Sequence, residues 1–456
     1  MSALAPERLL EDLGGAGQVI ADVDILASYR TDQAAPGLLP AGMPSAVVRP
    51  RTTAEVQAAV RAAARHGVPV VPRGAGTGLS GGANAIDGCL VVSLERMTDV
   101  VAIDPSSLLA TVQPGLVNDA LRAAVAREGL WYAPDPASHE SCTIGGNVAT
   151  NAGGLCCVKY GVTRDALLGL EVVLADGRAL RLGRRTRKGV AGYDLVSLLC
   201  GSEGTLGIVT EATVRLLPPP GPAATLAASF ATLGAAGEAI ARIVRETTPA
   251  LLELMDRTTI EAVEAMAPQG LDADVAALVF ARADGLAAVA EIERMARWCD
   301  EHGATLTITS DEEAEGRMLM QARRLAYPAL EHRGATLLDD IAVPLGQIPA
   351  LLEGVERIGE RHRLTIGTFG HAGDGNMHPT IVYDHRDPDQ VAHARDAFAE
   401  ILALGLELDG TITGEHGVGL LKHSALAGEL GAAHEVHRAI KHALDPTGLL
   451  NPGKGI

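Results

Sequence analysis

Two short motifs near the C-terminus carry side chains that can bind a metal ion or transfer a proton. The first spans 370–378 and places His371 and His378 on either side of a Gly-Asp-Gly turn; the second sets Glu415 and His416 between two glycines. Burying an imidazole without a partner is unfavourable, and glycine weakens helices and strands unless the backbone must turn or approach a ligand. The motifs therefore predict a site that holds a ligand.

The spacing of the two histidines in the first motif fits a turn between two strands, which would let them face each other. Two imidazoles and one carboxylate leave positions open on a divalent metal, which is typical of a catalytic site rather than a structural one. The alternative is a pair of hydrogen-bonded histidines in a tight turn that binds nothing.

The composition indicates a large globular protein. The chain has 456 residues, 47% of them hydrophobic, so we expect two or three domains. Its net charge is -18, from 38 basic and 56 acidic residues, and the stretch richest in Lys and Arg, 184–188, is short. This balance argues against a nucleic-acid-binding protein and against a basic membrane-binding face.

The sequence shows no targeting signal, and its one vicinal cysteine pair, Cys156-Cys157, is expected to pack rather than to be redox-active. The first eight residues lack the basic start and apolar stretch of a signal peptide, and no segment is long and apolar enough to span a membrane. The six cysteines follow no metal-ligand spacing. We therefore expect reduced thiols and a cytoplasmic protein.

Apolar patterns predict helices and strands on both sides of a proline cluster at 218–222. Before the cluster we expect helices at 54–67 and 117–128, a hairpin at 170–182, and strands at 68–72, 89–94, 109–112 and 207–217. After it we expect strands at 225–230, 276–281, 305–309 and 364–369, and helices at 233–246, 283–302, 312–326, 346–361 and 388–409. Several helices over a sheet indicate an α+β fold.

Three glycine-rich segments precede the proline cluster, at 72–82, 141–154 and 201–210. The first is a run of backbone amides with few Cβ atoms, which suits a pyrophosphate; a plain turn is the alternative, and no Walker pattern is present. The other two mix glycine with small hydroxyl and amide side chains. Three such loops together imply a large phosphate-containing ligand.

The three segments, their order and the C-terminal motifs resemble the FAD-linked oxidoreductases of the vanillyl-alcohol oxidase/p-cresol methylhydroxylase (PCMH) superfamily. Within it the chain resembles the group of D-lactate dehydrogenases, glycolate oxidase D-subunits and D-2-hydroxyglutarate dehydrogenases. The resemblance implies an N-terminal segment (1–39), a PCMH-type FAD-binding domain of two subdomains (40–219), an α+β substrate-capping domain (220–410) and a C-terminal helical return that completes the active site (411–456).

By this resemblance, the first segment holds the pyrophosphate of FAD through Pro72, Arg73, Gly74, Ala75, Gly76, Thr77, Gly78, Leu79 and Ser80. The flavin path is lined by Pro134, Asp135, Ser141, Thr143, Gly145, Gly146, Ala149, Gly153 and Gly154, with Ile208 at the adenine end and Asn451 as a further cofactor contact. Some relatives attach FAD covalently through a histidine in the first segment. Thr77 occupies the matching place here, so we expect non-covalent FAD.

The resemblance also assigns roles to the C-terminal motifs. His371, His378 and Glu415 match the metal ligands of the group, with Zn²⁺ favoured over Mn²⁺ and Fe²⁺. The metal would acidify the hydroxyl of a 2-hydroxy acid, His416 would take its proton, and a hydride would leave Cα for the flavin N5. The alternative is that His416 only supports Glu415.

The substrate carboxylate is expected to meet Arg323, which matches the carboxylate-binding arginine of the group, while Arg324 is its solvated neighbour. Hydroxyglutarate enzymes share a lysine and an asparagine where this chain has Leu338 and Thr380, and Tyr327 stands where a small hydroxyl residue would reach a second carboxylate. These departures favour lactate, glycolate or another aliphatic acid. The expected substrate contacts are Arg323, Tyr327, Thr380 and His416.

The implied function is FAD- and divalent-metal-dependent oxidation of a D-2-hydroxy acid to the 2-oxo acid. The chain lacks cluster-binding cysteines, so the electrons need an external acceptor: a quinone, a cytochrome or an electron-transfer flavoprotein. We expect a homodimer or a subunit of a larger oxidase, which could meet the membrane through its acceptor.

Four alternatives stay open. The chain could be a catalytic subunit that works only within a multi-subunit glycolate oxidase, with iron–sulfur partners, or it could be a D-2-hydroxyglutarate dehydrogenase. It could be a non-redox flavoenzyme like the alkylglycerone-phosphate synthases. A zinc-dependent hydrolase is the fourth, but it leaves the glycine-rich segments unexplained.

Overall fold

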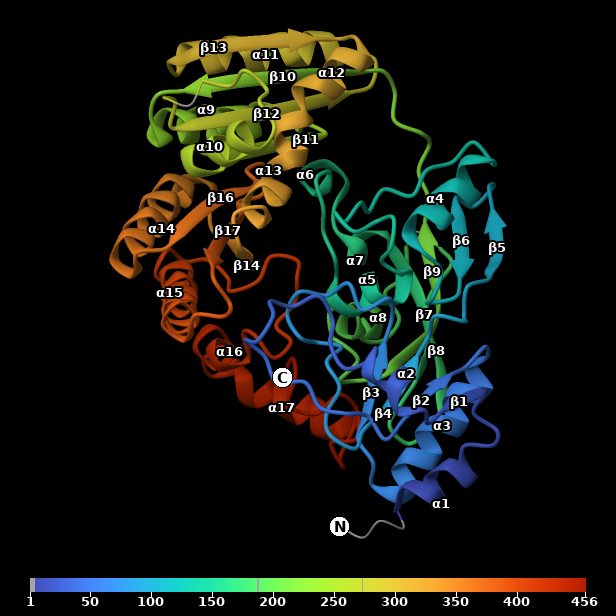
Figure 1. The fold of residues 1–456 in the computed structure, drawn as a ribbon. Coiled ribbons are helices and arrows are strands. Elements are labelled where there is room, and N and C mark those ends of the chain that lie inside the picture. The colour runs from blue at the N-terminus through green and yellow to red at the C-terminus, as the bar shows by residue number, and fades with distance from the viewer. Residues whose placement is uncertain (1–4, 187, 273) are drawn as a thin grey trace.

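The computed structural model describes residues 5–186, 188–272 and 274–456. Its strands form three sheets that follow one another along the chain (Figure 1). Residues 1–4 of the expected N-terminal segment lie outside this description. The combination of helices with largely antiparallel sheets confirms the expected α+β fold.

The first sheet is mixed and has the strand order β1-β2-β4-β3. Its strands are β1 (Gln18–Ile20), β2 (Ala46–Arg49), β3 (Val70–Arg73) and β4 (Leu90–Ser93), and its helices are α1 (Ala5–Asp12), α2 (Val23–Ala27) and α3 (Thr53–His66). The hydroxyl of Thr52 accepts a hydrogen bond from the Glu55 N–H at the start of α3, and Gly67 ends the helix with a φ of 61°. These two capping residues explain why both ends of α3 fall within one residue of the expected bounds.

The second sheet is antiparallel and has the order β5-β6-β9-β7-β8. Its strands are β5 (Val100–Asp104), β6 (Leu109–Val112), β7 (Leu167–Val173), β8 (Ala179–Gly183) and β9 (Ile208–Arg215). The associated helices are α4 (Asn118–Ala126), α5 (Ile144–Thr150), α6 (Cys157–Tyr160), α7 (Thr163–Ala166) and α8 (Leu195–Leu199). The pairing of β7 with β8 confirms the expected hairpin.

The third sheet has the order β13-β10-β12-β11-β16-β17-β14, and β15 also pairs with β17. Its strands are β10 (Ala223–Phe230), β11 (Leu251–Asp256), β12 (Ala277–Asp284), β13 (Ala304–Ser310), β14 (Ala335–Leu338), β15 (Ile341–Ala342), β16 (Thr365–His371) and β17 (Asn376–Tyr383). Its helices are α9 (Leu233–Glu246), α10 (Arg257–Met266), α11 (Ala288–Glu301), α12 (Glu313–Leu319), α13 (Gln321–Glu331), α14 (Ile348–His362) and α15 (Pro388–Glu407).

Side-chain alternation along the strands gives the third sheet two different faces. On one face Leu226, Leu254 and Ile381 pack with buried residues of α9, α11, α14 and α15. On the other face Met255 and Phe369 pack with residues of α10 and α13. His371 and His378 of the first C-terminal motif lie on this second face, because they alternate along β16 and β17 in step with Phe369.

The C-terminal chain returns to the first sheet through α16 (His423–Leu430) and α17 (Ala433–Leu444), drawn red in Figure 1. The N–H of Val70 donates to the carbonyl of Leu449, and the N–H of Asn451 donates back to Val70. The buried Lys454 ammonium donates to the carbonyls of Gly82 and Asn84. The end of the chain is therefore hydrogen-bonded to β3 at the edge of the first sheet and to the loop that follows β3.

Three local expectations were wrong. The segment 141–154, expected as a loop, contains α5, because Thr143 caps the helix and Ile144 and Val148 are buried. The helix expected at 312–326 is divided into α12 and α13 at Met320. The helix expected at 283–302 begins at Ala288, since β12 continues to Asp284 and the chain turns afterwards.

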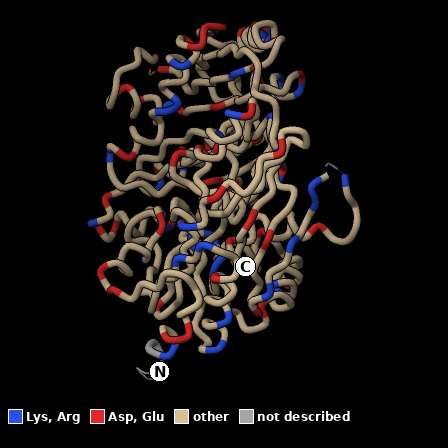
Figure 2. The backbone as a smooth tube through the Cα atoms, turned by 90° about the vertical axis from the view of Figure 1, so that its right-hand side faces the viewer, with Lys and Arg blue, Asp and Glu red and all other residues tan. Residues whose placement is uncertain are grey.

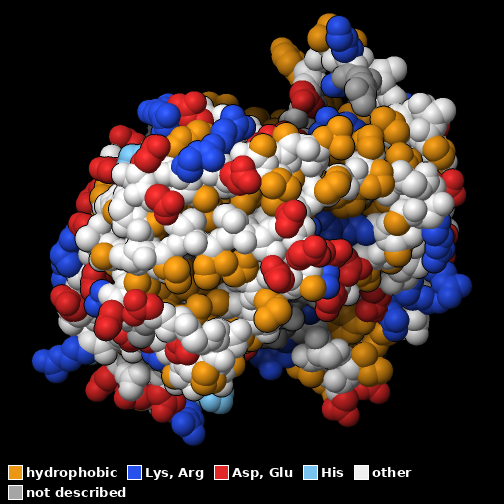
Figure 3. Space-filling view, turned by 90° about the horizontal axis from the view of Figure 1, so that it is seen from above, with side chains coloured by type: hydrophobic (Ala, Val, Ile, Leu, Met, Phe, Trp, Pro, Cys, Tyr) orange, Lys and Arg blue, Asp and Glu red, His pale blue; other side chains and the backbone are white. Residues whose placement is uncertain are grey.

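Charged side chains are spread over the molecule. Figure 2 shows Lys and Arg interspersed with Asp and Glu along the backbone, and the face in Figure 3 carries both signs among apolar side chains. Within the described ranges, no helix has both the length and the apolar character that crossing a bilayer demands.

Candidate active site

The hairpin of β16 and β17 brings His371 and His378 to one face of the third sheet. Phe369 pairs with His378 and His371 with Asn376, so the two histidines are offset by one pleat across the ladder. Their ring centroids lie 5.1 Å apart, edge to face. The turn needs Gly375, which has a φ of 83° and whose Cβ, if present, would lie 2.1 Å from the Val343 carbonyl oxygen.

Glu415 reaches both histidines from the C-terminal segment. Its Oε1 lies 3.4 Å from His371 Nε2 and 3.5 Å from His378 Nε2. All three side chains are largely buried, and their donor atoms converge closely enough to hold one metal ion. The donor set of two imidazoles and one carboxylate is the set that the sequence predicted to meet, and it fits a divalent metal with open positions.

His416 lies beside this group, and the four residues His371, His378, Glu415 and His416 are called the histidine cluster below. The ring of His416 stacks on that of His378, with 5.1 Å between centroids and 14° between planes. Its Nε2 lies 3.7 Å from Glu415 Oε1. At 19% exposure its side chain is the most accessible of the cluster, where a proton acceptor for a substrate would have to be.

The protonation of the cluster follows from burial and mutual charge. Burial raises the pKa of Glu415, but the hydrogen bond and the charge of His371, with smaller contributions from the neighbouring imidazoles, outweigh it and bring that pKa to about 2. Burial lowers the pKa of His378, and His371 and His416 lower it further, to about 3. Burial lowers the pKa of His371, but Glu253 and Glu415 outweigh it and raise that pKa well above its usual value. A metal ion bound by His371 Nε2 would therefore replace the proton shared with Glu415.

Asp340 anchors the backbone that carries Glu415 and His416. Its Oδ2 accepts hydrogen bonds from the N–H of Glu415 at 2.9 Å, the N–H of His416 at 2.8 Å and the hydroxyl of Thr413 at 2.8 Å. Burial raises the pKa of Asp340, yet His416, Lys422 and His378 hold it well below its usual range. The same carboxylate lies 3.9 Å from His378 Nδ1 and 4.0 Å from His416 Nδ1.

Neither Asp340 nor Glu253 was among the residues predicted for the site. Glu253 lies in β11 and is fully buried; its Oε1 accepts from His371 Nδ1 at 2.8 Å. The available signal was a carboxylate inside an otherwise apolar run, as in Leu251-Leu252-Glu253-Leu254. A buried charge of this kind must be paired, although the sequence does not name the partner.

Arg323 and Arg324 point in different directions from α13. Arg323 is buried, and its Nε and Nη2 both lie 2.7 Å from Glu253 Oε2. Its guanidinium also lies over the ring of Phe369, at 4.8 Å. Arg324 is exposed and donates to the carbonyl of Arg317. The structure therefore places Arg323, and not Arg324, against Glu253, which in turn contacts His371 of the histidine cluster.

The residues predicted to contact the tail of the substrate lie on α13 and on the adjoining strands. Tyr327 follows Arg323 by one helical turn, and its hydroxyl lies 3.0 Å from that of Thr336. Thr380 is buried beside His378 and donates to the His378 carbonyl at 3.1 Å. Leu338 is paired with Thr380 across β14 and β17. Hydroxyl and apolar groups, without a second cation among them, form this part of the site.

Residues from all three glycine-rich segments line a groove formed by elements of the first and second sheets. It is lined by Pro72, Arg73, Gly74, Leu94, Pro114, Gly145, Gly146, Ala149, Leu199, Ser202, Glu203, Gly204, Gly207, Ile208 and Val209. Seven of the predicted cofactor residues are in this set: Pro72, Arg73, Gly74, Gly145, Gly146, Ala149 and Ile208. The shortage of side-chain atoms at the glycines leaves backbone amides accessible, which suits a phosphate-containing cofactor.

Other predicted cofactor residues shape the groove or lie beyond it. Thr143 caps α5 by accepting from the Gly146 N–H, and the Asp135 carboxylate accepts from the Cys156 N–H. Ser141 is exposed and donates to the Ser138 carbonyl. Pro134 and Gly154 are buried at the turn near Asp135, whereas Ala75, Gly76, Thr77, Gly78 and Leu79 form the partly exposed loop after β3.

The glycine-rich segments also touch the C-terminal motif directly. Ser80, at the end of the first segment, donates to the Gly417 carbonyl at 2.9 Å. Glu203, in the third segment, accepts from the N–H groups of Val418 and Gly419, each at 2.8 Å. Asn451 donates to the carbonyls of Gly82 and Glu203, joining the first and third segments. Glu203 was not predicted; its charge within a glycine-rich segment was the available signal.

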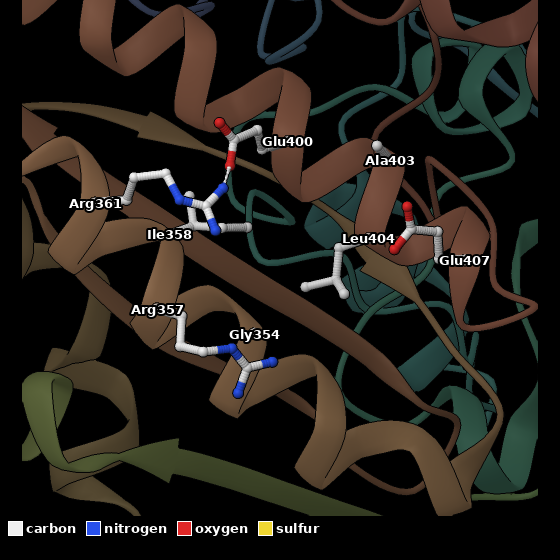
Figure 4. A pocket seen from close by; sticks show the side chains of 8 residues that line it. All are labelled: Gly354, Arg357, Ile358, Arg361, Glu400, Ala403, Leu404 and Glu407. Carbon is white, nitrogen blue, oxygen red and sulfur yellow. Dashed lines mark hydrogen bonds and ion pairs between the residues drawn. The ribbon is translucent and has the colours of Figure 1, made fainter.

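A second hollow lies on the surface between α14 and α15, away from these residues (Figure 4). It is lined by Gly354, Arg357, Ile358, Arg361, Glu400, Ala403, Leu404 and Glu407. Arg361 is paired with Glu400 across it, as the dashed line in Figure 4 marks. None of the predicted site residues lines this hollow.

Family models match most of the chain. The model described as "FAD linked oxidases, C-terminal domain" matches residues 220–455, and the model described as "FAD binding domain" matches residues 44–183. Among solved structures, p-cresol methylhydroxylase with substrate bound is 18% identical with a TM-score of 0.82, covering 100% of this chain and 97% of the other. At that identity, the likeness concerns the fold.

Relatives of similar length have higher identities. The chain is 41% identical to "Glycolate oxidase subunit GlcD" of Bacillus subtilis, over 97% of this chain and 93% of the relative. It is 34% identical to "D-lactate dehydrogenase" of Archaeoglobus fulgidus, over 94% and 95%. It is 36% identical to "D-2-hydroxyglutarate dehydrogenase" of Xanthomonas citri pv. viticola, over 90% and 89%.

Proposed function

The chain belongs to the family of FAD-linked oxidases, and on that premise we propose that it is an FAD- and divalent-metal-dependent dehydrogenase of D-2-hydroxy acids. The observation that carries the proposal is the contact between the second glycine-rich segment and the histidine cluster. A Cβ on Gly153 would lie 2.5 Å from Glu415 Oε2. A flavin site and a metal site that adjoin in this way can act on one substrate.

The proposed organisation follows the three sheets. Residues 40–219 form the FAD-binding domain, 220–410 the substrate-capping domain, and 411–456 the segment that completes the active site between them. The glycine-lined groove holds the FAD, and bound FAD supplies the acceptor for the hydride that leaves Cα of the substrate. Because position 77 is a threonine, the FAD is held without a covalent bond.

His371, His378 and Glu415 are the proposed metal ligands, with Zn²⁺ preferred and Mn²⁺ or Fe²⁺ as alternatives. Their convergence in the protein interior and the lowered pKa of Glu415, which favours the ionised carboxylate, support this assignment. A bound divalent ion supplies a Lewis acid for the hydroxyl and carboxylate of the substrate. The 2-hydroxy acid would thus be oriented by two of its own oxygens.

His416 is the proposed base. Its accessibility, its stacking on His378 and its distance from the Asp340 carboxylate support a role in taking the hydroxyl proton. Arg323 is the proposed partner of the substrate carboxylate, and its fixed guanidinium suits that geometry. The hydroxyl proton goes to His416, and the two electrons of the Cα–H bond leave as hydride, which gives the 2-oxo acid.

The tail of the pocket favours a small acid. Tyr327, Leu338 and Thr380 offer hydroxyl and apolar contacts, and the hydroxyls of Tyr327 and Thr380 already have protein partners. D-Lactate and glycolate suit such a tail, whereas a second carboxylate would meet no cation among these three described residues. D-2-Hydroxyglutarate is the alternative substrate, supported by the relative that bears the name of that dehydrogenase.

The electrons pass to an external acceptor, for which a quinone, a cytochrome or an electron-transfer flavoprotein are the candidates. A second proposal is that the chain is the catalytic subunit of a larger glycolate oxidase, because a relative at 41% identity is named as such a subunit. Turnover of D-lactate or glycolate by the isolated chain with an artificial dye supports the first proposal, and turnover only with partner subunits supports the second.

The experiment that tests the proposed function is anaerobic flavin reduction by a panel of acids. The purified protein is mixed with D- and L-lactate, glycolate and D-2-hydroxyglutarate, and absorbance near the flavin maximum is recorded. Rapid bleaching by D-lactate or glycolate is expected. Bleaching by none of the acids rules out the proposal and favours a non-redox flavoenzyme, and a colourless protein rules out the flavin.

A further inference from the structure

Glu253 is a carboxylate in the interior of the third sheet. It lies in β11, is fully buried, and is flanked along the strand by buried Leu252 and Leu254. An ionised group in such a place is strongly unfavourable unless each of its oxygens is hydrogen-bonded. Its two oxygens are in fact used by two different partners.

One partner is His371, on the neighbouring strand. Leu254 pairs with Gly370 and Met255 with Phe369 across β11 and β16, so the antiparallel register places Glu253 opposite His371 on the same face. Glu253 Oε1 lies 2.8 Å from His371 Nδ1. The Nδ1–H donates to the carboxylate, which leaves Nε2 as the nitrogen directed toward Glu415.

The other partner is Arg323, on the helix that packs over this face. Its Nε and Nη2 both lie 2.7 Å from Glu253 Oε2, so one edge of the guanidinium is fixed. The ring of Phe369 lies under the guanidinium at 4.8 Å and restricts its plane. The Nη1 end takes no part in the pair and is the part of the group that can meet an anion.

From these contacts we infer that Glu253 is a positioning residue that joins the metal ligand His371 to the substrate-binding Arg323 and so sets the distance between metal and carboxylate sites. The inference rests on the proposed function. A 2-hydroxy acid whose hydroxyl and carboxylate meet the metal, and whose carboxylate also meets the arginine, needs both groups at a fixed separation. One rigid carboxylate that contacts both provides that constraint.

A merely structural carboxylate would stabilise the sheet without affecting either ligand. The variant Glu253→Gln keeps the size of the side chain and removes its charge. We expect its Zn²⁺ affinity to fall about 10- to 100-fold, because the orienting partner of His371 is weakened. We also expect the KM for D-lactate to rise at least about tenfold, because Arg323 loses the carboxylate that holds it.

The matched control is Glu171→Gln. Glu171 lies in β7 of the second sheet, not in the sheet that carries His371 and His378, is partly buried, and pairs with Arg181 at 2.8 Å. The same substitution there should leave Zn²⁺ affinity and KM unchanged. Should Glu253→Gln not fold, Glu253→Asp keeps the charge but shortens the side chain, which moves the carboxylate away from His371 and Arg323. The same fall in Zn²⁺ affinity and the same rise in KM are expected.

The experiment measures Zn²⁺ affinity by competition with a chromophoric chelator, and KM by dye reduction, on the FAD-loaded full chain. A lower Zn²⁺ affinity together with a higher KM in the Glu253 variant, with FAD content retained and the Glu171 control unchanged, supports the inference. Parent-like Zn²⁺ affinity and KM in a folded Glu253 variant overturn it while the proposed function stands. A parent protein that binds no Zn²⁺ and oxidises no hydroxy acid overturns both.

Discussion

The Cα of Gly153 lies against the carboxylate of Glu415, so closely that a Cβ at position 153 would be 2.5 Å from Glu415 Oε2 and 3.2 Å from Glu415 Cβ. These residues are far apart in the sequence. Gly153 follows α5, one of the helices of the second sheet, and Glu415 follows the strands of the third sheet. Through this contact the second glycine-rich segment lies directly against the histidine cluster.

The contact predicts that Gly153→Ala damages the metal site. The added methyl group must displace the Glu415 carboxylate from His371 and His378, so we expect Zn²⁺ affinity to fall about tenfold or more. Chelator competition measures this. Gly234→Ala is the control, because a Cβ at that position on α9 meets no atom within 4 Å. Equal affinities in the two variants would show that Glu415 does not hold the metal.

Removal of the metal should abolish turnover and leave the flavin in place. We expect dialysis against EDTA to stop D-lactate oxidation, and added Zn²⁺ or Mn²⁺ to restore it, because the substrate loses its Lewis acid. His378→Ala should be inactive like the dialysed protein, and added metal should not restore its activity. His385→Ala, at an exposed position, should keep the activity of the parent protein. Full activity in a preparation shown by elemental analysis to be metal-free would contradict the metal assignment.

Substitution of His416 should separate cofactor binding from chemistry. His416→Ala is expected to keep its FAD and to slow flavin reduction by about 10²- to 10⁴-fold, the usual contribution of a general base. Stopped-flow spectroscopy of the anaerobic half-reaction measures the rate. His423→Ala, at the exposed start of α16, is the control. Normal reduction kinetics in His416→Ala would exclude the residue as the base.

The two adjacent arginines of α13 offer a matched pair. Arg323→Lys should raise the KM for D-lactate about 10-fold or more, because a point charge replaces a planar fork already oriented by Glu253. Arg324→Lys should not change it, since that side chain is exposed. Steady-state kinetics with an artificial acceptor compare the two. The opposite ranking would mean that the neighbouring arginine binds the carboxylate.

Local signals in the sequence were sufficient for several elements. The helix expected at 233–246 coincides with α9, because Thr232 caps its first turn and an apolar stripe runs along it. The spacing of His371 and His378 across glycines indicated a turn between strands, and β16 and β17 form that hairpin. Periodicity and capping depend on residues close in the chain, so one sequence reveals them.

The contacts that complete the site depend on distant residues and could not be predicted in the same way. Glu253 meets His371 through the register of β11 and β16, which the intervening helices and strands determine together. Asp340 was recognisable as one of two adjacent carboxylates between apolar residues, but its role in binding the Glu415 and His416 amides depends on the loop after α15. Helix α5 formed within a glycine-rich segment because tertiary burial outweighed weak helix propensity.

The most direct measurement of the central claim is anaerobic flavin reduction by D-lactate carrying deuterium at C2. The account predicts that D-lactate reduces the bound FAD in a single rapid phase and that the deuterated acid does so several-fold more slowly, because the Cα–H bond breaks as the flavin is reduced. Flavin that stays oxidised with every 2-hydroxy acid tested, or reduction at the same rate with both isotopes, would contradict it.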